Sequence, residues 1–330
     1  MKRLIALVLG VLALLGLRRL WTVPGIVDPE GPDVVLADDG VPLWVQVDEA
    51  PGAELTVVLV HGFTARHEEF ALQRRTLLGR ARVVLYDQRG HGASGWGDPR
   101  HADLDQLGRD LGAVLERHAP TGPVVLLGHS MGGMTVMALA RQRPELFGTR
   151  VVGVFLLATS AGEVASDGTL GRVVGLGTRY HVVGIWLRLL QSAAPALQRL
   201  RKPGTRVGYA FTRHYLFGTD DADPETVRVV QDLLEMAPFS VSAAFYPLFV
   251  GLDELGSLAA MREVPVTVLV GDSDRLTPKV HSERIVAVIG PTAELVVVPG
   301  AGHTVNITRQ QVVDDAILAL LDRARIRAVA

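Results

Sequence analysis

Eight short apolar runs alternate with helical segments along most of this chain, and this alternation constrains its fold more than any other feature. Several of the later runs are apolar at every position, as expected for strands that are buried on both faces of a parallel sheet. Strands that alternate with helices predict an α/β protein with helices on both faces of the sheet. The runs are Asp33 to Leu36, Leu43 to Val47, Leu55 to Val60, Val83 to Tyr86, Val124 to Leu127, Val151 to Leu157, Val266 to Val270 and Leu295 to Val298.

Local turn and capping signals add detail to this prediction. Asp38-Asp39-Gly40 separates the first two runs and predicts a hairpin. A helix is expected from Leu104 to Glu116, with Asp103 as its N-cap and Gln106 three residues later. The last helix is expected near residues 309–324, with an apolar face made of Val312, Val313, Ala316, Ile317, Leu320 and Leu321.

The stretch from residue 161 to 250 breaks the alternation, because it contains no strand-like run. Helices and loops with several prolines are expected there, as an insertion into the sheet-forming chain. Aromatic residues are concentrated in it, either to pack the insertion against the sheet or to line an apolar cleft beneath it. We expect Trp186, Tyr215 and Phe245 of this stretch to contact substrate.

A candidate nucleophile follows the fifth run. Ser130 lies in Gly128-His129-Ser130-Met131-Gly132-Gly133, between a predicted strand and a predicted helix. Glycine two residues before and two residues after a serine is typical of a sharp strand–turn–helix, in which only small residues fit around the turn. This nucleophile elbow would lift the serine hydroxyl clear of the sheet.

A serine nucleophile needs a base and a carboxylate, and the backbone must supply donors for the oxyanion. The loop after Val266 to Val270 contains Asp272 and Asp274, and His303 follows Leu295 to Val298. Both loops leave the carboxyl ends of strands, the edge where open α/β sheets place their sites. We assign the oxyanion donors to the backbone amides of Phe63 and Met131, the latter at the positive end of its helix.

These motifs together resemble the α/β-hydrolase family. The resemblance is carried by His61-Gly62-Phe63, by Asp87-Gln88-Arg89-Gly90-His91-Gly92-Ala93-Ser94, by Gly128 to Gly133, by Gly271-Asp272-Ser273-Asp274 and by Gly302-His303. It implies an α/β-hydrolase fold with an eight-stranded, mostly parallel sheet. The core would comprise residues 30–160 and 251–330, and residues 161–250 would form a helical lid.

The resemblance also bears on the roles of single residues. It selects Asp274 as the acid, three residues after the glycine, and leaves Asp272 to cap the turn. His91 and His129 lie within tight glycine turns, where packing or hydrogen bonding of their side chains is expected. Asp87 and Arg89 are expected to hold their loop rather than touch substrate.

The N-terminus has the pattern of a membrane-targeting segment. Lys2 and Arg3 precede an apolar run over residues 4–17, and Arg18 and Arg19 follow it. As a helix this run is about 21 Å long, shorter than a bilayer core of about 30 Å. We expect residues 1–23 to be an anchor or signal-like segment of a membrane-associated or exported protein, with its cleavage left open. The alternatives are a helix buried in the fold and a cytoplasmic protein.

Composition excludes several classes of function. The 33 basic and 35 acidic residues nearly balance, so no basic surface for nucleic acid is expected. The absence of cysteine rules out disulfides, thiolate metal sites and cysteine nucleophiles. No cluster of His, Asp and Glu has the spacing of a metal site, and no cofactor is expected.

The sequence therefore predicts a serine hydrolase that cleaves small carboxylic esters, with a lipophilic acyl group, through a triad of Ser130, His303 and Asp274. Alternatives on the same scaffold are a cofactor-free haloperoxidase or perhydrolase and a carbon–carbon bond hydrolase. From another class, the alternative is a non-catalytic binding protein. The natural ester and the oligomeric state stay open.

Overall fold

The computed structural model describes residues 33–162, 204–219 and 222–329. The expected N-terminal segment over residues 1–23 and the candidate Trp186 lie outside these ranges.

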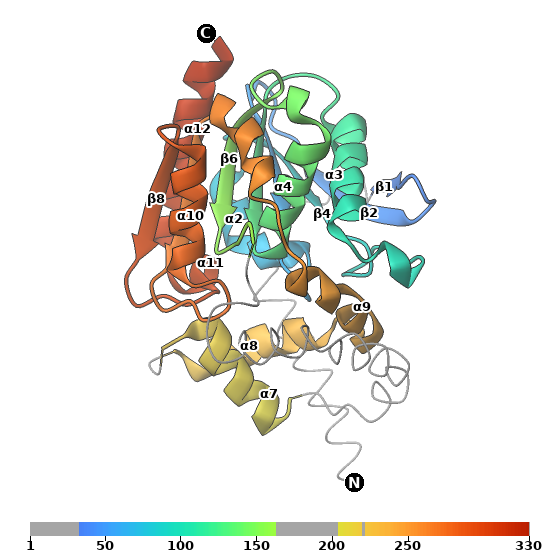
Figure 1. The fold of residues 1–330 in the computed structure, drawn as a ribbon, viewed down its shortest axis with the longest axis vertical. Helices are drawn as coiled ribbons and strands as arrows, with labels where there is room; N and C mark the ends of the chain where they lie inside the picture. Colours follow the sequence, from blue (N-terminus) through green and yellow to red (C-terminus); the bar gives the residue numbers. More distant parts are fainter. Residues whose placement is uncertain (1–32, 163–203, 220–221, 330) are drawn as a thin grey trace.

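An eight-stranded, mostly parallel sheet forms the centre of the molecule (Figure 1). Its order is β1-β2-β4-β3-β5-β6-β7-β8, and only the pairs β1–β2 and β2–β4 are antiparallel. All eight predicted runs form strands, and the predicted hairpin joins the first two. The strands are β1 (Asp33–Leu36), β2 (Pro42–Asp48), β3 (Thr56–Val60), β4 (Arg82–Tyr86), β5 (Val124–His129), β6 (Val151–Leu157), β7 (Val266–Gly271) and β8 (Ala293–Val298).

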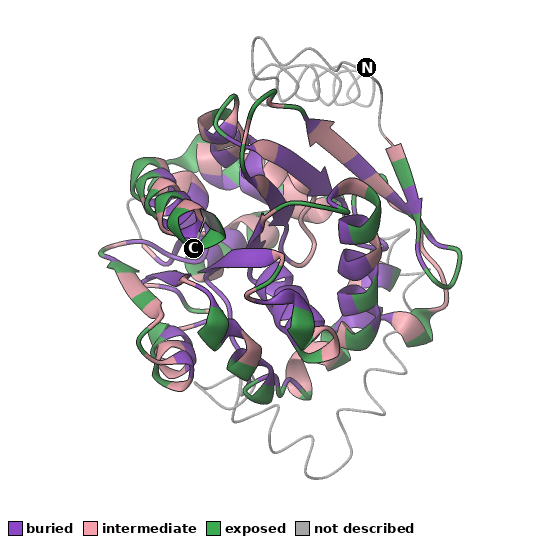
Figure 2. Ribbon diagram, turned by 90° about the horizontal axis from the view of Figure 1, so that it is seen from above, coloured by how far each residue is buried: buried purple, intermediate pink, exposed green. Residues whose placement is uncertain are grey.

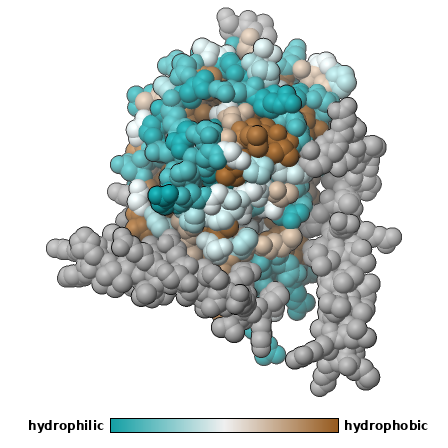
Figure 3. All heavy atoms as spheres, turned by 90° about the vertical axis from the view of Figure 1, so that its right-hand side faces the viewer, coloured by the Kyte–Doolittle hydropathy of each residue, from teal (hydrophilic) through white to brown (hydrophobic). Residues whose placement is uncertain are grey.

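Helices cover both faces of the sheet, as predicted. Buried side chains of α3 (Leu104–His118), α4 (Met131–Gln142) and α10 (Lys279–Ile289) pack on one face. Those of α2 (Ala71–Leu77) and α12 (Gln310–Val329) pack on the other. Figure 2 shows the result, with buried strands in the middle and helices whose exposed residues face outward. On the face drawn in Figure 3 the described surface is mainly hydrophilic, with a small hydrophobic patch.

Shorter helical segments lie between these elements. They are η1 (His67–Phe70), η2 (Pro99–His101), η3 (Pro144–Leu146), η5 (Gly256–Glu263) and α11 (Val305–Thr308).

Two predicted helices can be compared in detail. The carboxylate of Asp103 accepts the amide of Gln106 at 2.8 Å, so it caps α3 as predicted. In α12 the predicted apolar face is buried except at the half-buried Ala316 and at Val312, which is 42% exposed. Val312 precedes the buried Val313 on the helix, and a step of about 100° per residue turns the two side chains to different faces.

The loop after β4 is held by buried charges, as predicted. Asp87 accepts the amides of His67 and Ala93, both at 2.8 Å. The guanidinium of Arg89 is almost fully buried and pairs with Asp110 of α3 at 2.6 Å and Asp39 of the hairpin turn at 2.8 Å. Ion pairs therefore connect this loop to α3 and to the hairpin turn between β1 and β2.

The described part of the insertion is helical, as predicted. It comprises α7 (Arg206–Phe211), the π-helical turn η4 (Thr212–Phe217), α8 (Pro224–Glu235) and α9 (Phe239–Val250). In Figure 1 these elements lie beyond the carboxyl ends of β6 and β8, at the lower edge of the sheet. Within the ranges given above, no single helix is long and apolar enough to span a bilayer, and only α8 and α9 together pass that test, as a pair bent by 94°.

Candidate active site

Ser130 lies on a strained turn between β5 and α4. Its backbone has φ +52° and ψ −117°, in the left-handed half of conformational space that residues with a side chain rarely adopt. A Cβ on Gly132 would lie 2.0 Å from the carbonyl oxygen of Val60, and one on Gly128 would lie 2.5 Å from that of Gly132. The two glycines therefore allow the close approach that the turn requires, as the motif predicts.

The acid and base loops meet at the same edge of the sheet. Nδ1 of His303 donates to Oδ2 of Asp274 at 2.8 Å, and both side chains are buried. The other oxygen of Asp274 accepts the amides of Leu276 and Thr277, at 2.8 and 2.9 Å. Burial alone would raise the pKa of Asp274, but His303 and these donors lower it overall, so the carboxylate stays ionised.

Asp272 has a different role from Asp274. Its exposed carboxylate accepts the amide of Gly300 at 2.9 Å and the hydroxyl of Ser273 at 3.0 Å. Asp272 therefore bridges the acid loop to the turn after β8 and does not contact His303. This is the turn-capping position that the sequence predicts for it.

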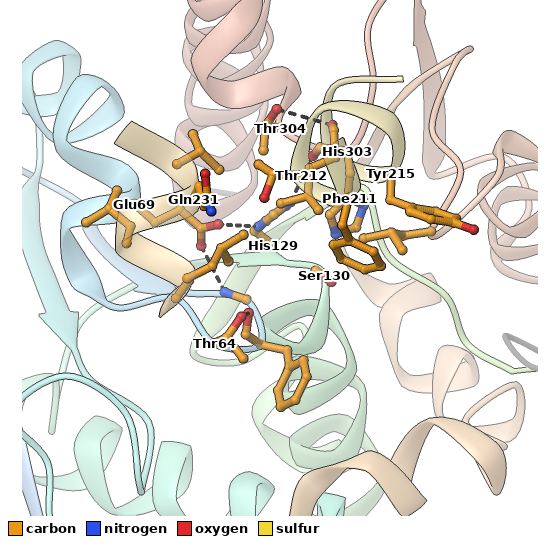
Figure 4. Close-up of a pocket in the computed structure, with 18 of the residues that line it drawn as sticks. Thr64, Glu69, His129, Ser130, Phe211, Thr212, Tyr215, Gln231, His303 and Thr304 are labelled. Atoms are coloured by element: carbon orange, nitrogen blue, oxygen red, sulfur yellow. Dashed lines mark hydrogen bonds and ion pairs between the residues drawn. The ribbon is translucent and has the colours of Figure 1, made fainter. Parts of the chain in front are cut away.

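A large apolar cavity of about 820 Å³ opens over Ser130 and His303, which both line it (Figure 4). Side chains from the insertion form much of its wall, including Phe211, Tyr215 and Leu234. Tyr215 thus lies where a substrate contact is expected.

Phe245 lies elsewhere, which corrects the expected substrate contact. Its ring is fully buried in a cluster with Met131 and Leu107, beside Trp96, and it does not line the cavity. Phe245 therefore packs α9 against the core. The sequence does not distinguish the two positions, because both are aromatic residues on helices of the insertion.

Two backbone amides are available beside Ser130. Phe63 lines the cavity directly after Gly62, where an added Cβ would lie 3.3 Å from Cβ of Ser130. Met131 is the first residue of α4. Among the described residues, no acceptor binds the amide of Phe63 or of Met131. Both amides are therefore candidates for the oxyanion donors that the sequence predicts.

Histidines in the neighbouring turns are held by the backbone. Nε2 of His61 accepts the amide of Gln88 at 2.9 Å, and Nδ1 of His91 donates to the carbonyl of Arg89 at 2.9 Å. Burial lowers the pKa of His91 to about 3, so its ring is neutral. No group of three or more His, Asp or Glu side chains is placed to hold a metal ion in the described part of the chain.

Glu69 and its contact with His129 were not anticipated from the sequence. Oε1 of Glu69, on η1, lies 2.7 Å from Nδ1 of His129, and both residues line the cavity (Figure 4). Sixty positions separate the two residues, and no local pattern pairs them. The expectation that the side chain of His129 packs or forms hydrogen bonds holds, but its partner was not predicted.

Comparisons with known proteins agree with this fold. The model of the alpha/beta hydrolase family matches residues 57–316. A monoacylglycerol lipase of Mycolicibacterium smegmatis is 28% identical over 79% of this chain and 85% of its own length. The structure of a thermophilic esterase from Thermogutta terrifontis has a TM-score of 0.70 at 25% identity, covering 89% of this chain and 99% of that one.

Other relatives are longer proteins. The dihydrolipoyllysine-residue acetyltransferase component of the acetoin cleaving system of Pseudomonas putida is 27% identical over 84% of this chain, which spans 66% of its length. The polyketide synthase ThaQ of Burkholderia thailandensis is 26% identical over 81% of this chain, and the match covers 12% of the synthase. The family match extends over more than half of the sequence, and the chain therefore belongs to the alpha/beta hydrolase family.

Proposed function

We propose that this protein hydrolyses carboxylic esters through an acyl-enzyme formed on Ser130. The observation that carries the proposal is the buried His303–Asp274 pair at 2.8 Å, because His303 lines one cavity together with a serine on a strained elbow. A serine hydroxyl becomes nucleophilic when a neighbouring imidazole removes its proton, and a carboxylate stabilises the imidazolium that forms.

The roles of the residues follow from their places. Ser130 attacks the ester carbonyl while His303 takes its proton, and His303 then returns that proton to the leaving alcohol. In the second half of the reaction His303 activates water, which releases the acid and regenerates Ser130. The amides of Phe63 and Met131 donate to the oxyanion of each tetrahedral intermediate.

The cavity favours esters with a lipophilic acyl group. Its described lining includes Phe211, Leu216, Val230, Leu234 and Phe249, which offer apolar surface to an acyl chain. One relative is named as a monoacylglycerol lipase and one structural neighbour as an esterase, which supports an ester as the substrate. In this proposal α7, η4, α8 and α9 form the described part of a lid over the site.

We further propose that residues 4–17 associate the protein with a membrane. This rests on the sequence pattern of an apolar run between basic residues. A substrate dissolved in the bilayer would then reach the cavity without crossing water.

Replacing the nucleophile should abolish hydrolysis. Ser130→Ala is expected to lower kcat for p-nitrophenyl butyrate by roughly 10³-fold or more, because only binding and oxyanion stabilisation remain. A fluorophosphonate probe should label the wild type and not this variant. Ser240→Ala removes an exposed serine of α9 and serves as the control. Wild-type turnover by Ser130→Ala would refute the mechanism.

The two aspartates of the acid loop should differ sharply. Asp274→Asn is expected to lower kcat by roughly 10³- to 10⁴-fold, because the amide cannot stabilise the imidazolium and favours the wrong tautomer. The matched Asp272→Asn variant keeps an acceptor for the Gly300 amide and should retain nearly full kcat. Steady-state kinetics and urea unfolding of both variants test this. The acid assignment is wrong if Asp272→Asn is the inactive one.

Acyl length should govern the specificity constant. With p-nitrophenyl esters from acetate to decanoate, kcat/KM should rise by at most about fourfold per methylene until the cavity is full. This factor corresponds to a free energy of burial of about 0.8 kcal/mol per methylene. Leu234→Trp, which fills part of the cavity, should move the optimum to shorter chains. Leu255→Trp, at an exposed position outside the lining, is the control. A preference for acetate in the wild type would contradict an acyl-binding cavity.

Removing the N-terminal segment should separate chemistry from substrate supply. A protein lacking residues 1–23 is expected to hydrolyse dissolved short esters at the wild-type rate and to lose activity toward long-chain esters in phospholipid vesicles. Vesicle flotation of both proteins measures the association directly. A full-length double variant, Leu9→Glu with Leu12→Glu, keeps the length but not the apolar character and should behave like the truncation. If the truncated protein floats with vesicles as well as the wild type does, the anchor assignment fails.

A further inference from the structure

The carboxylate of Glu69, whose side chain is 13% exposed, connects three loops of the site. Oε2 of Glu69 accepts the amide of Gly62 at 2.8 Å, and Oε1 lies 2.7 Å from Nδ1 of His129. The opposite ring nitrogen, Nε2 of His129, lies 3.1 Å from the backbone oxygen of His303. Glu69 and His129 thus link the loop before Phe63 to the loop that carries His303, directly beside Ser130 (Figure 4).

The acceptors on both sides of His129 determine its charge. A backbone carbonyl can only accept, so Nε2 must carry a proton. Nδ1 lies 2.7 Å from Oε1 of Glu69 as an ion-pair contact that lacks hydrogen-bond geometry, and a carboxylate at this distance favours a second proton on the ring. Burial alone would raise the pKa of Glu69, but His129 and the Gly62 amide bring it below its ordinary value. Burial alone would lower the pKa of His129, but the nearby carboxylate of Glu69 outweighs this effect, and the pKa of His129 is raised. The proton therefore resides on His129, and the pair is an imidazolium with a carboxylate.

A second connection reinforces the first. The side-chain amide of Asn306, on α11 just after the base, donates to the backbone carbonyl of Glu69 at 3.2 Å. Gln73 of α2 donates in turn to the backbone carbonyl of Asn306 at 3.0 Å. Glu69 is therefore held through both its side chain and its backbone.

Other ionisable groups also face the pair. Asp274 and the ring of His303 approach His129 from the acid and base loops, and His61 approaches Glu69 from the oxyanion loop. Asp274 adds to the attraction for a proton on His129, whereas His303 must stay free to gain and lose one. The ion pair can keep its charge through each turnover because it donates to the backbone of His303 and not to its ring.

We propose that Glu69 and His129 are a positioning pair for the reaction, which rests on the ester hydrolysis proposed above. Their ion pair fixes the distance between the loop that supplies the Phe63 amide and the loop that carries His303. Breaking it lets the oxyanion donor and the base move relative to Ser130. The effect falls on kcat, because a shift of about 1 Å in reacting groups can cost up to about 100-fold in rate.

Variants of Glu69 and His129, with a control variant at the neighbouring Glu68, test the proposal in the full-length protein. Glu69→Gln keeps an oxygen for the Gly62 amide but removes the charge, and His129→Gln keeps a donor near the His303 carbonyl. Each should lower kcat for p-nitrophenyl butyrate by roughly 10- to 100-fold with KM changed less than about twofold. The double variant should lose little more than either single one, because the residues act as a unit. Glu68→Gln is the matched control, since Glu68 on the same η1 pairs with Arg66 and not with His129.

The pH profile separates positioning from a purely structural role. Because the pKa of His129 is raised, the ring loses its second proton at a higher pH than an ordinary histidine, and kcat should fall as the pH rises through that value. In Glu69→Gln the imidazolium lacks its counter-charge, and this fall should move to lower pH. Glu68→Gln should keep the wild-type profile. ¹⁵N NMR of the ring nitrogens, assigned with His129→Gln, should show His129 losing its second ring proton at a higher pH in the wild type than in Glu69→Gln.

The outcomes distinguish this proposal from the one on which it rests. Wild type that hydrolyses no ester, or an active Ser130→Ala, refutes the hydrolytic mechanism, while the NMR measurement still decides whether the ion pair exists. The positioning role is overturned if the wild type is active and Glu69→Gln keeps its kcat and pH profile. It is also overturned if kcat falls only in proportion to the folded fraction measured by urea unfolding, or if His129 loses its second ring proton at the same pH in the wild type and in Glu69→Gln.

Discussion

The backbone of Ser130 is the constraint on which the other parts of the site depend. Its positive φ is maintained from both sides, because its amide donates to Leu157 at 2.9 Å and its carbonyl accepts from the hydroxyl of Thr159 at 2.7 Å. Strain of this kind costs on the order of 1–3 kcal/mol and persists only where the surroundings enforce it. Here the end of β6 and Thr159 just after it enforce it, so the edge of the sheet sets the position of the serine. The acid and base loops then need only reach the same sheet edge.

The sheet and its turns could be predicted from the sequence because each depends on a pattern of neighbouring residues. The eight strands, the hairpin and the Asp103 cap each depend on residues that are close in sequence, and all are present. The different contacts of Asp272 and Asp274 also agree with the family motif, because the motif specifies how many residues separate the acid from the glycine.

What was not predicted depends on contacts between distant segments. Phe245 and Tyr215 are both aromatic residues of the insertion, and only the packing of α9 against the core decides that one is buried while the other faces the cavity. Val312 has the residue type of a core position but lies on the outer face of α12. The contact between Glu69 and His129 joins η1 to the elbow, and no periodicity or turn signal encodes it.

In the described part of the chain, residues 216–218 of the insertion contact the loops that carry Asp274 and His303. The carbonyl of Leu216 accepts the amide of Thr304 at 3.0 Å, and a Cβ on Gly302 would lie 2.3 Å from the backbone of Phe217. Gly218 is equally close to the acid loop, because a Cβ there would lie 2.2 Å from the carbonyl of Ser273. A chimera that takes its insertion from a relative must therefore bring the backbone of residues 216–218 together with matching acid and base loops. The same holds for α8 and α9, because Val227 and Val230 of α8 pack with Leu216 and Phe217, and Phe245 of α9 packs with Met131. Recombination would therefore have to transfer the insertion and its supporting loops as one unit.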